Sequence, residues 1–373
     1  MIFRAERFSS TPGWLVLSDG SSFEAELITS ADFEGHQEVH TGEVVFNTSL
    51  TGYQEVATDP SYAGQFIAFT NPHIGNYGCN ALDMESAKIW ASGVIVRDYS
   101  PVYSNYRATM SLLELTQHSG VPLISGVDTR ALTRHIRVHG ALGAVIGTAS
   151  LETLTALANR DLTTTGKDLA TGAGRRSRLE IPGPGPRVVA IDYGMKSSII
   201  TQLSKHFEVV VVPADTPAQD ILAEMPKGIF LSNGPGDPAA IDYSDQQILG
   251  LLGRVPIFGI CLGHQLLARA IGASTYKLEF GHHGGNHPVS RLRDKVVEIT
   301  SQNHNYAVDE ESLLKANSAA KITHLNLNDG VVEGFSLASE RAFCVQYHPE
   351  AGPGPHDSYY LFDEFKDLVI ANG

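Results

Sequence analysis

The stretch Pro256-Ile257-Phe258-Gly259-Ile260-Cys261-Leu262-Gly263-His264-Gln265 places a cysteine between an apolar run and a segment of helical character. The apolar run predicts a buried strand that ends at Cys261, and residues 264–271 predict a helix directly after it. Glycines two residues before and after the cysteine permit the sharp turn of a nucleophile elbow, G-x-C-x-G. A cysteine alone is more often a buried structural residue, but this strand–cysteine–helix frame favours a nucleophile whose thiolate the helix N-terminus stabilises.

The chain around the elbow alternates buried strands with helices. Strands are predicted at 188–192, 209–212, 228–232 and 256–260, and helices at 197–203, 218–225, 245–252 and 264–271. Continuous apolar strands that alternate with helices indicate a sheet covered on both faces. We therefore expect an α/β fold for residues 187–373, with a doubly wound, mostly parallel sheet whose ligand lies at the carboxyl ends of the strands.

The first part of the chain has a different pattern of short strands. The apolar runs 14–17 and 23–27 flank Ser18-Asp19-Gly20 and predict a hairpin, and later segments predict helices at 110–116 and 129–136. We expect residues 1–154 to form a separate α+β domain that is rich in strands. Residues 155–186 are polar and rich in glycine, and they include Pro182-Gly183-Pro184-Gly185-Pro186, so we expect them to be a linker.

Composition excludes several classes of protein. The length of 373 residues predicts at least two domains, and a formal net charge of −14 argues against nucleic-acid partners and anionic membrane surfaces. The three cysteines, Cys79, Cys261 and Cys344, form no disulfide framework, and we expect Cys79 and Cys344 to be structural. The chain has no apolar run of about 18 residues and no signal-peptide pattern, so we expect a cytoplasmic protein without a membrane partner.

A base for the cysteine is predicted in Tyr347-His348-Pro349-Glu350, which follows a strand at 342–346. In an extended chain residues i and i+2 share a face, so we expect His348 and Glu350 to point the same way, with Pro349 keeping the segment extended. His348 is then the general base and acid, and Glu350 fixes its tautomer and stabilises the imidazolium.

Two glycine-containing segments complete the candidate site. The amide of Leu262 follows the nucleophile and is placed to donate to an oxyanion. Ser232-Asn233-Gly234-Pro235-Gly236-Asp237-Pro238 follows the strand at 228–232 and is either a plain turn or a loop that aims amides at a reacting carbonyl. The chain shows no P-loop and no convincing dinucleotide motif, so we expect no nucleotide on it.

The elbow, the Gly-Pro-Gly loop and the His-Pro-Glu segment together resemble class I (triad) glutamine amidotransferases. Other motifs are similar to the small-chain family of carbamoyl-phosphate synthetases over nearly the whole chain. These motifs span residues 46–55, 59–65, 72–78, 126–133, 281–288 and 301–304.

The resemblance implies a class I glutaminase fold and a catalytic triad of Cys261, His348 and Glu350. Cys261 would attack the carboxamide of glutamine, release ammonia and form a glutamyl thioester that water hydrolyses. The amides of Gly234 and Leu262 would form the oxyanion hole. The family's glutamine-binding positions fall on Ser49, Gly234, Gly236, Leu262, Gln265, Asn303, Asn305 and Tyr306, with Ser49 reaching the site from the N-terminal domain.

One of these positions departs from the family pattern. The family has a glycine where this chain has Asn305 in His304-Asn305-Tyr306. Asparagine adopts positive φ more readily than most residues, so we expect a backbone contact with the substrate there.

The resemblance also implies a large-subunit partner that binds ATP and Mg²⁺ and makes carbamoyl phosphate from bicarbonate, for arginine or pyrimidine biosynthesis. Ammonia would reach it through an enclosed passage, the N-terminal domain would supply the interface, and this chain would need no cofactor. Three alternatives remain: an amidotransferase subunit of another synthase, a Cys-His-Glu γ-glutamyl hydrolase or peptidase, and a non-catalytic regulatory subunit.

Two further groups of residues are assigned structural roles. His282, His283 and His287 crowd a glycine-rich segment that we expect to be a loop. No carboxylate or cysteine joins them at ligand spacing, so we expect loop packing or a partner contact and no metal. We expect Lys196, which follows Asp192-Tyr193-Gly194-Met195, to make a subunit or inter-loop contact.

Overall fold

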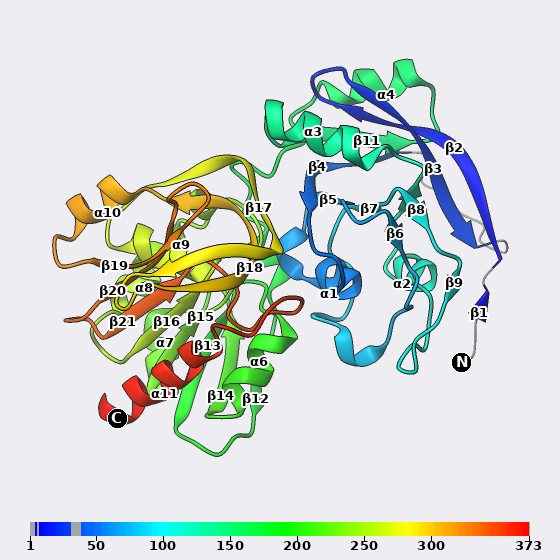
Figure 1. Ribbon diagram of the computed structural model, residues 1–373. Helices are drawn as coiled ribbons and strands as arrows, with labels where there is room; N and C mark the ends of the chain where they lie inside the picture. Colours follow the sequence, from blue (N-terminus) through cyan, green and yellow to red (C-terminus); the bar gives the residue numbers. More distant parts are fainter. Residues whose placement is uncertain (1–3, 6, 31–38, 373) are drawn as a thin grey trace. The chain divides into compact units, whose positions relative to one another are not determined.

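The computed structural model describes residues 4–5, 7–30 and 39–372, and the chain divides into two compact units, Met1–Thr165 and Gly166–Gly373 (Figure 1). The division falls inside residues 155–186, which we expected to be a linker. Much of that segment is folded: helix α4 (Leu151–Ala158) belongs to the first unit, and strand β12 (Leu179–Ile181) joins a sheet of the second. Ala170, in the short helix α5 (Ala170–Ala173), is fully buried in the core of the second unit.

The first unit is built on a closed barrel, and its strand-rich α+β character agrees with the prediction. The predicted hairpin is present as β2 (Phe8–Leu17) paired antiparallel with β3 (Ser22–Ser30). The barrel has the order β10-β3-β2-β11-β4-β5-β7 and closes between β10 and β7. Its other strands are β4 (Val39–Asn47), β5 (Gln65–Phe69), β7 (Gly93–Ile95), β10 (Leu123–Ser125) and β11 (Leu142–Gly147).

Side-chain caps begin the helices α2 and α3 of this unit. Ser111 and Glu114 form a capping box at the start of α2 (Leu112–His118), and Asp128 accepts the amide of Ala131 at the start of α3 (Thr129–His139). Both helices lie where the sequence predicts helices. The remaining elements are β1 (Arg4–Ala5), α1 (Tyr53–Thr58), η1 (Pro60–Tyr62), β6 (His73–Ile74), η2 (Ala81–Asp83), β8 (Asp98–Tyr99) and β9 (Val102–Tyr103).

The second unit contains one ten-stranded sheet in the order β12-β14-β13-β15-β16-β21-β20-β19-β17-β18. The run from β14 (Glu208–Pro213) through β13 (Arg187–Asp192), β15 (Gly228–Leu231) and β16 (Ile257–Ile260) to β21 (Ala342–Val345) is parallel. Its helices are α6 (Ser197–Ser204), α7 (Ala218–Ala223), α8 (Tyr243–Leu251), α9 (Leu262–Ala270), α10 (Glu310–Ala316) and α11 (Tyr360–Asn372), with the short η3 (Pro238–Ala240) after β15.

Helices cover both faces of the parallel strands, as the apolar runs predict. Alternate residues of β13 enter different cores: Val189 and Ile191 pack with α7, α8 and α9, whereas Val188 and Ala190 pack with α6 and α11. A strand that is buried on both faces must be apolar at every position. The α/β class of this unit is therefore confirmed.

The rest of the sheet is antiparallel, so the sheet is more mixed than we expected. β20 (Val332–Leu337) pairs with β21, β19 (Lys321–Asn326) with β20, and β17 (Thr275–Arg291) with β19 and with β18 (Val296–Val308). The predicted glycine-rich loop around 281–288 is wrong, because these residues lie within β17. Register shifts in the β17–β18 pairing at 277–282 and 284–287 break the period-2 alternation that reveals a strand in a sequence. No helix among the described residues is long and apolar enough to cross a membrane.

Candidate active site

The parts of the predicted site follow four neighbouring parallel strands. The strands β13, β15, β16 and β21 are adjacent in the sheet and end shortly before Lys196, Gly234, Cys261 and His348, respectively. Because the carboxyl ends of parallel strands lie at one edge of a sheet, the fold gathers these residues at that edge.

Cys261 occupies the sharp turn that the elbow pattern predicts. It follows β16 directly, precedes α9 directly and has φ 54° and ψ −103°, a backbone conformation that is strained for a residue with a side chain. The flanking glycines leave room for this turn. A Cβ on Gly263 would lie 2.3 Å from the carbonyl oxygen of Leu231, and one on Gly259 would lie 2.8 Å from the carbonyl oxygen of Gly263.

His348 and Glu350 meet, although not in the way that we expected. His348 Nδ1 lies 2.6 Å from Glu350 Oε1, and both residues are only 2% exposed. β21 ends at Val345, and the amide of Ala351 donates to the carbonyl of His348 at 3.1 Å, so a turn rather than an extended chain brings the two side chains together. The amide of His348 is held by the carbonyl of Ser301 at 2.9 Å.

Lys196 is a member of this cluster that sequence reasoning missed. Its Nζ lies 3.0 Å from Glu350 Oε1 and 2.5 Å from the carbonyl oxygen of Ala351, and the side chain is 2% exposed. The expected inter-loop contact is present, because the lysine lies in the loop after β13 and is buried against Glu350 and Ala351 in the turn after β21. Its position just after a parallel strand, at the same sheet edge as Cys261, was the signal available in the sequence.

The charges of the cluster set its protonation states. Burial alone would lower the pKa of His348, but the carboxylate of Glu350 and the sulfur of Cys261 outweigh it and raise that pKa. Burial alone would raise the pKa of Glu350, but Lys196 and His348 outweigh it and lower that pKa. The arrangement therefore favours an imidazolium between the carboxylate of Glu350 and the sulfur of Cys261.

The two predicted oxyanion donors lie in backbone suited to that role. The amide of Leu262 is the first N–H of α9, where no acceptor exists within the helix. Gly234 lies in the loop after β15, and a Cβ there would lie 2.2 Å from the carbonyl oxygen of Tyr193 and 2.9 Å from the Leu262 side chain. Gly236 has φ +101°, which favours glycine. The amide of Gly263 donates to the carbonyl of Ser232 at 3.0 Å and joins this loop to the elbow.

The remaining predicted glutamine-binding residues of this unit lie on α9 and β18. Gln265 is buried, and its side-chain amide donates to the carbonyl of Tyr306 at 2.8 Å. The thiol of Cys261 lies 3.5 Å from the carbonyl oxygen of Asn303. The residue Asn305 lies inside β18 and does not have the positive φ that we expected there, and its backbone contact with the substrate stays a prediction.

Ser49 lies in the first unit, just after β4, and its amide donates to Asn47 Oδ1 at 2.8 Å. Its contribution to a glutamine site stays a prediction. The two other cysteines, Cys79 and Cys344, are buried, and burial raises the pKa of each thiol, which suits the structural role that we expected.

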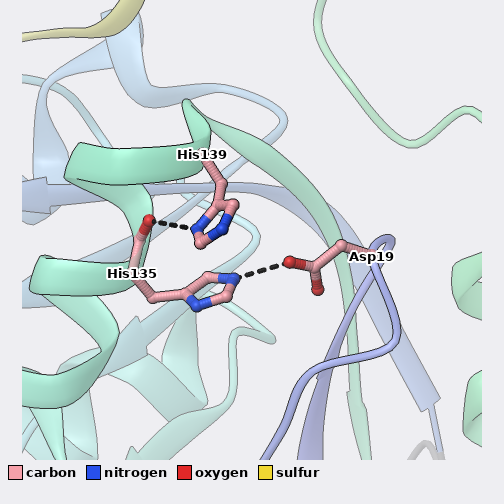
Figure 2. Close-up of side chains that lie close together, drawn as sticks. All are labelled: Asp19, His135 and His139. Carbon is pink, nitrogen blue, oxygen red and sulfur yellow. Dashed lines mark hydrogen bonds and ion pairs between the residues drawn. The ribbon is translucent and has the colours of Figure 1, made fainter.

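Two groups of histidine and carboxylate side chains could hold a metal ion within the described residues. One is Asp19, His135 and His139 in the first unit (Figure 2). The other lies in the second unit and contains His282 and Glu333, with Asp329 close by. Our expectation that no carboxylate joins the His282 segment is therefore wrong, because Asp329 and Glu333 are distant from it in sequence and are brought to it by the sheet.

Comparison with known proteins agrees with both halves of this description. Residues 15–146 match the family described as carbamoyl-phosphate synthase small chain, CPSase domain, and residues 189–368 match glutamine amidotransferase class-I. The chain is 51% identical over 366 residues to the carbamoyl phosphate synthase small chain of Chlorobaculum tepidum, with 96% of this chain and 98% of that protein covered. It is 47% identical over 376 residues to the small chain of Syntrophotalea carbinolica, with the same shares covered. The chain therefore belongs to the small-chain family of carbamoyl-phosphate synthases and carries a class I glutamine amidotransferase domain.

Proposed function

We propose that this chain hydrolyses L-glutamine to glutamate and supplies the ammonia to a large subunit that makes carbamoyl phosphate from bicarbonate and ATP. The observation that carries the proposal is the buried Cys261, His348 and Glu350 arrangement at the carboxyl edge of the parallel strands. This arrangement suits acyl transfer, because it combines a thiol nucleophile, an imidazole that serves as its base and a carboxylate that orients the imidazole.

The proposed chemistry uses only groups of the protein. The Cys261 thiolate attacks the side-chain carbonyl carbon of glutamine, and the amides of Gly234 and Leu262 stabilise the oxyanion. The imidazolium of His348 gives its proton to the departing nitrogen, so ammonia leaves and a glutamyl thioester remains. His348 then takes a proton from water, which attacks the thioester and releases glutamate.

The substrate would be held by residues at the same sheet edge. We propose that Gly236, Gln265, Asn303, Asn305 and Tyr306 bind glutamine together with Gly234 and Leu262, and that Ser49 adds a contact from the first unit. Asn305 would contribute a backbone contact, which needs no positive φ in an extended strand.

The fate of the ammonia requires a partner. Ammonium is a poor nucleophile and is the main form in neutral water, so unprotonated ammonia must travel in an enclosed passage to be used. We propose that ATP and Mg²⁺ act on the large subunit, and that the first unit supplies most of the interface with it.

Trapping the glutamyl thioester tests the proposed hydrolysis of glutamine. Acid quenching of the full-length chain with labelled glutamine should leave label on the wild type and none on Cys261→Ser, and hydroxylamine should release it as the hydroxamate. Label that persists on Cys261→Ser would contradict the assignment. Turnover of γ-glutamyl peptides at rates equal to glutamine would favour the free-standing hydrolase instead.

A further inference from the structure

Three strands from the antiparallel part of the sheet in the second unit bring two histidines and a glutamate together in the interior. His282 lies on β17, His304 on β18 and Glu333 on β20, and one ligand atom from each lies within 4.8 Å of the others. Their exposed fractions are 6%, 5% and 0%. Imidazole nitrogens and a carboxylate are the donors that zinc-class ions prefer, and this set lies outside the triad described above.

Hydrogen bonds fix the tautomer of each histidine and leave one ring nitrogen of each without a hydrogen-bond partner. His282 Nε2 lies 2.8 Å from Asp329 Oδ2, and His304 Nδ1 lies 2.7 Å from the carbonyl oxygen of Tyr306. A carboxylate and a carbonyl can only accept, so each of these nitrogens donates. The opposite nitrogens, His282 Nδ1 and His304 Nε2, are therefore lone-pair acceptors, and neither has a hydrogen-bond partner.

Glu333 contributes a carboxylate that lacks a full countercharge. Its Oε1 accepts from Asn326 Nδ2 at 2.7 Å, and its Oε2 accepts from Gln302 Nε2 at 3.0 Å. Within the described residues no lysine or arginine forms an ion pair with it, and its Oε1 lies 3.9 Å from the bare His282 Nδ1. Burying a carboxylate without a cation costs folding free energy, and the two imidazole nitrogens without hydrogen-bond partners beside it add to that cost.

We propose that His282 Nδ1, His304 Nε2 and Glu333 Oε1 bind one divalent transition-metal ion of the zinc class. Bonds of about 2.0–2.2 Å in a tetrahedral site place neighbouring donors roughly 3.4 Å apart. His282 Nδ1 and Glu333 Oε1 lie 3.9 Å apart, so the two atoms need to move only slightly closer together to bind the same ion. Asp329 and the Tyr306 carbonyl take the place of the outer partners that orient metal-bound histidines.

The site would stiffen the strand that we assign to glutamine binding. His304 lies between Asn303 and Asn305 on β18, and the Tyr306 carbonyl accepts from both His304 and Gln265. A metal on His304 would therefore hold the backbone of β18 in place. This effect on glutamine binding rests on the proposed function, whereas metal binding itself does not.

The test uses the purified full-length chain after chelator treatment and titration with Co²⁺, followed by visible absorption and metal analysis. We expect one tightly bound Co²⁺ per chain with the spectrum of a tetrahedral site, displaced by Zn²⁺. Glu333→Gln should weaken binding at least 100-fold while retaining the fold by circular dichroism. The new carbonyl oxygen can still accept from Asn326 Nδ2, and the new NH2 group can donate to Gln302 once that side chain turns its unpartnered Oε1 toward it. Asp329→Asn should weaken it about 10- to 100-fold.

The exposed Asp19, His135 and His139 group provides the matched control (Figure 2). There His135 Nε2 already pairs with Asp19 Oδ2 at 2.6 Å, and the carbonyl of His135 accepts from His139 Nδ1 at 3.0 Å. His139→Asn should leave the tight Co²⁺ site unchanged. The proposal is overturned if the wild type binds no Co²⁺ tightly, if Glu333→Gln binds as well as the wild type, or if His139→Asn abolishes the binding.

Discussion

Glu350 is the residue on which the charges of the candidate active site depend. Its Oε1 contacts both Lys196 Nζ and His348 Nδ1, and all three side chains are buried. A single unpaired charge buried in this way would cost several kcal/mol of folding free energy, so each of the three charged side chains is stabilised by the other two. The role of Lys196 follows from this contact: it holds Glu350 ionised and so helps to keep His348 oriented.

Substitutions of His348 and Glu350 should separate the role of the general acid and base from that of the group that orients it. His348→Asn removes the general acid and base, which is typically worth about 10²- to 10⁴-fold, so we expect a loss of kcat in that range. Glu350→Gln keeps a hydrogen-bond acceptor for His348 Nδ1, and we expect a smaller loss. Single-turnover glutamine hydrolysis measures both, and equal rates for the wild type and both variants would remove the dyad from the mechanism.

The same dyad predicts a pH dependence of stability. The raised pKa of His348, about 10 against an ordinary 6.5, contributes stability that is complete below pH 6.5 and is lost as pH rises toward 10. The lowered pKa of Glu350 contributes stability above its ordinary 4.5 that is lost as pH falls toward 2.

The difference in free energy of unfolding between the wild type and His348→Asn should therefore be largest between pH 4.5 and 6.5 and shrink above that range. Denaturant titrations at several pH values measure it. A difference that stays constant up to pH 10 would show that His348 carries no raised pKa in the folded chain.

Among the elements, the elbow between β16 and α9 leaves little room for larger side chains. We expect Gly263→Ala to destabilise the chain by about 1–3 kcal/mol, because the added Cβ would meet the Leu231 carbonyl oxygen. Gly172→Ala is the matched control: nothing lies within 4 Å of its Cβ, so we expect little change. Denaturant unfolding compares the two variants, and equal stabilities would contradict the close approach.

The elements also show how far the sequence leads. Strand–helix alternation and the G-x-C-x-G turn were sufficient to predict the parallel strands, four of the helices that cover them and the place of Cys261. The helix α11, which packs on Val188 and Ala190, was missed. The β17–β18 hairpin was missed because bulges and glycines interrupt its alternation. The approach of Glu333 to His282 could not be predicted, because it depends on the register of strands that lie far apart in sequence.

For the whole molecule, the boundary near Thr165 predicts which fragment is stable. Residues 166–373 retain β12, which covers the β14 edge, and Ala170, which is buried in the core. Residues 187–373 lack both and expose a strand edge, so we expect a lower melting temperature and aggregation. Circular dichroism and size-exclusion chromatography distinguish the two fragments, and equal behaviour would show that residues 166–186 add nothing to the fold.

The 166–373 fragment also tests the division of labour between the units. We expect a KM for glutamine that is roughly 5- to 150-fold higher, because loss of the Ser49 contact costs about 1–3 kcal/mol. We also expect no binding to the large subunit. An unchanged KM and an intact complex in a pull-down would place both functions in the second unit.

The most direct test of the whole account uses two nitrogen sources on one preparation. The full-length Cys261→Ser chain is assembled with its large subunit, and carbamoyl phosphate synthesis is measured with glutamine and then with ammonia. The account predicts that synthesis from glutamine is abolished while synthesis from ammonia continues at the wild-type rate. Synthesis from glutamine that persists in Cys261→Ser would contradict the central claim that this cysteine releases the nitrogen used by the partner.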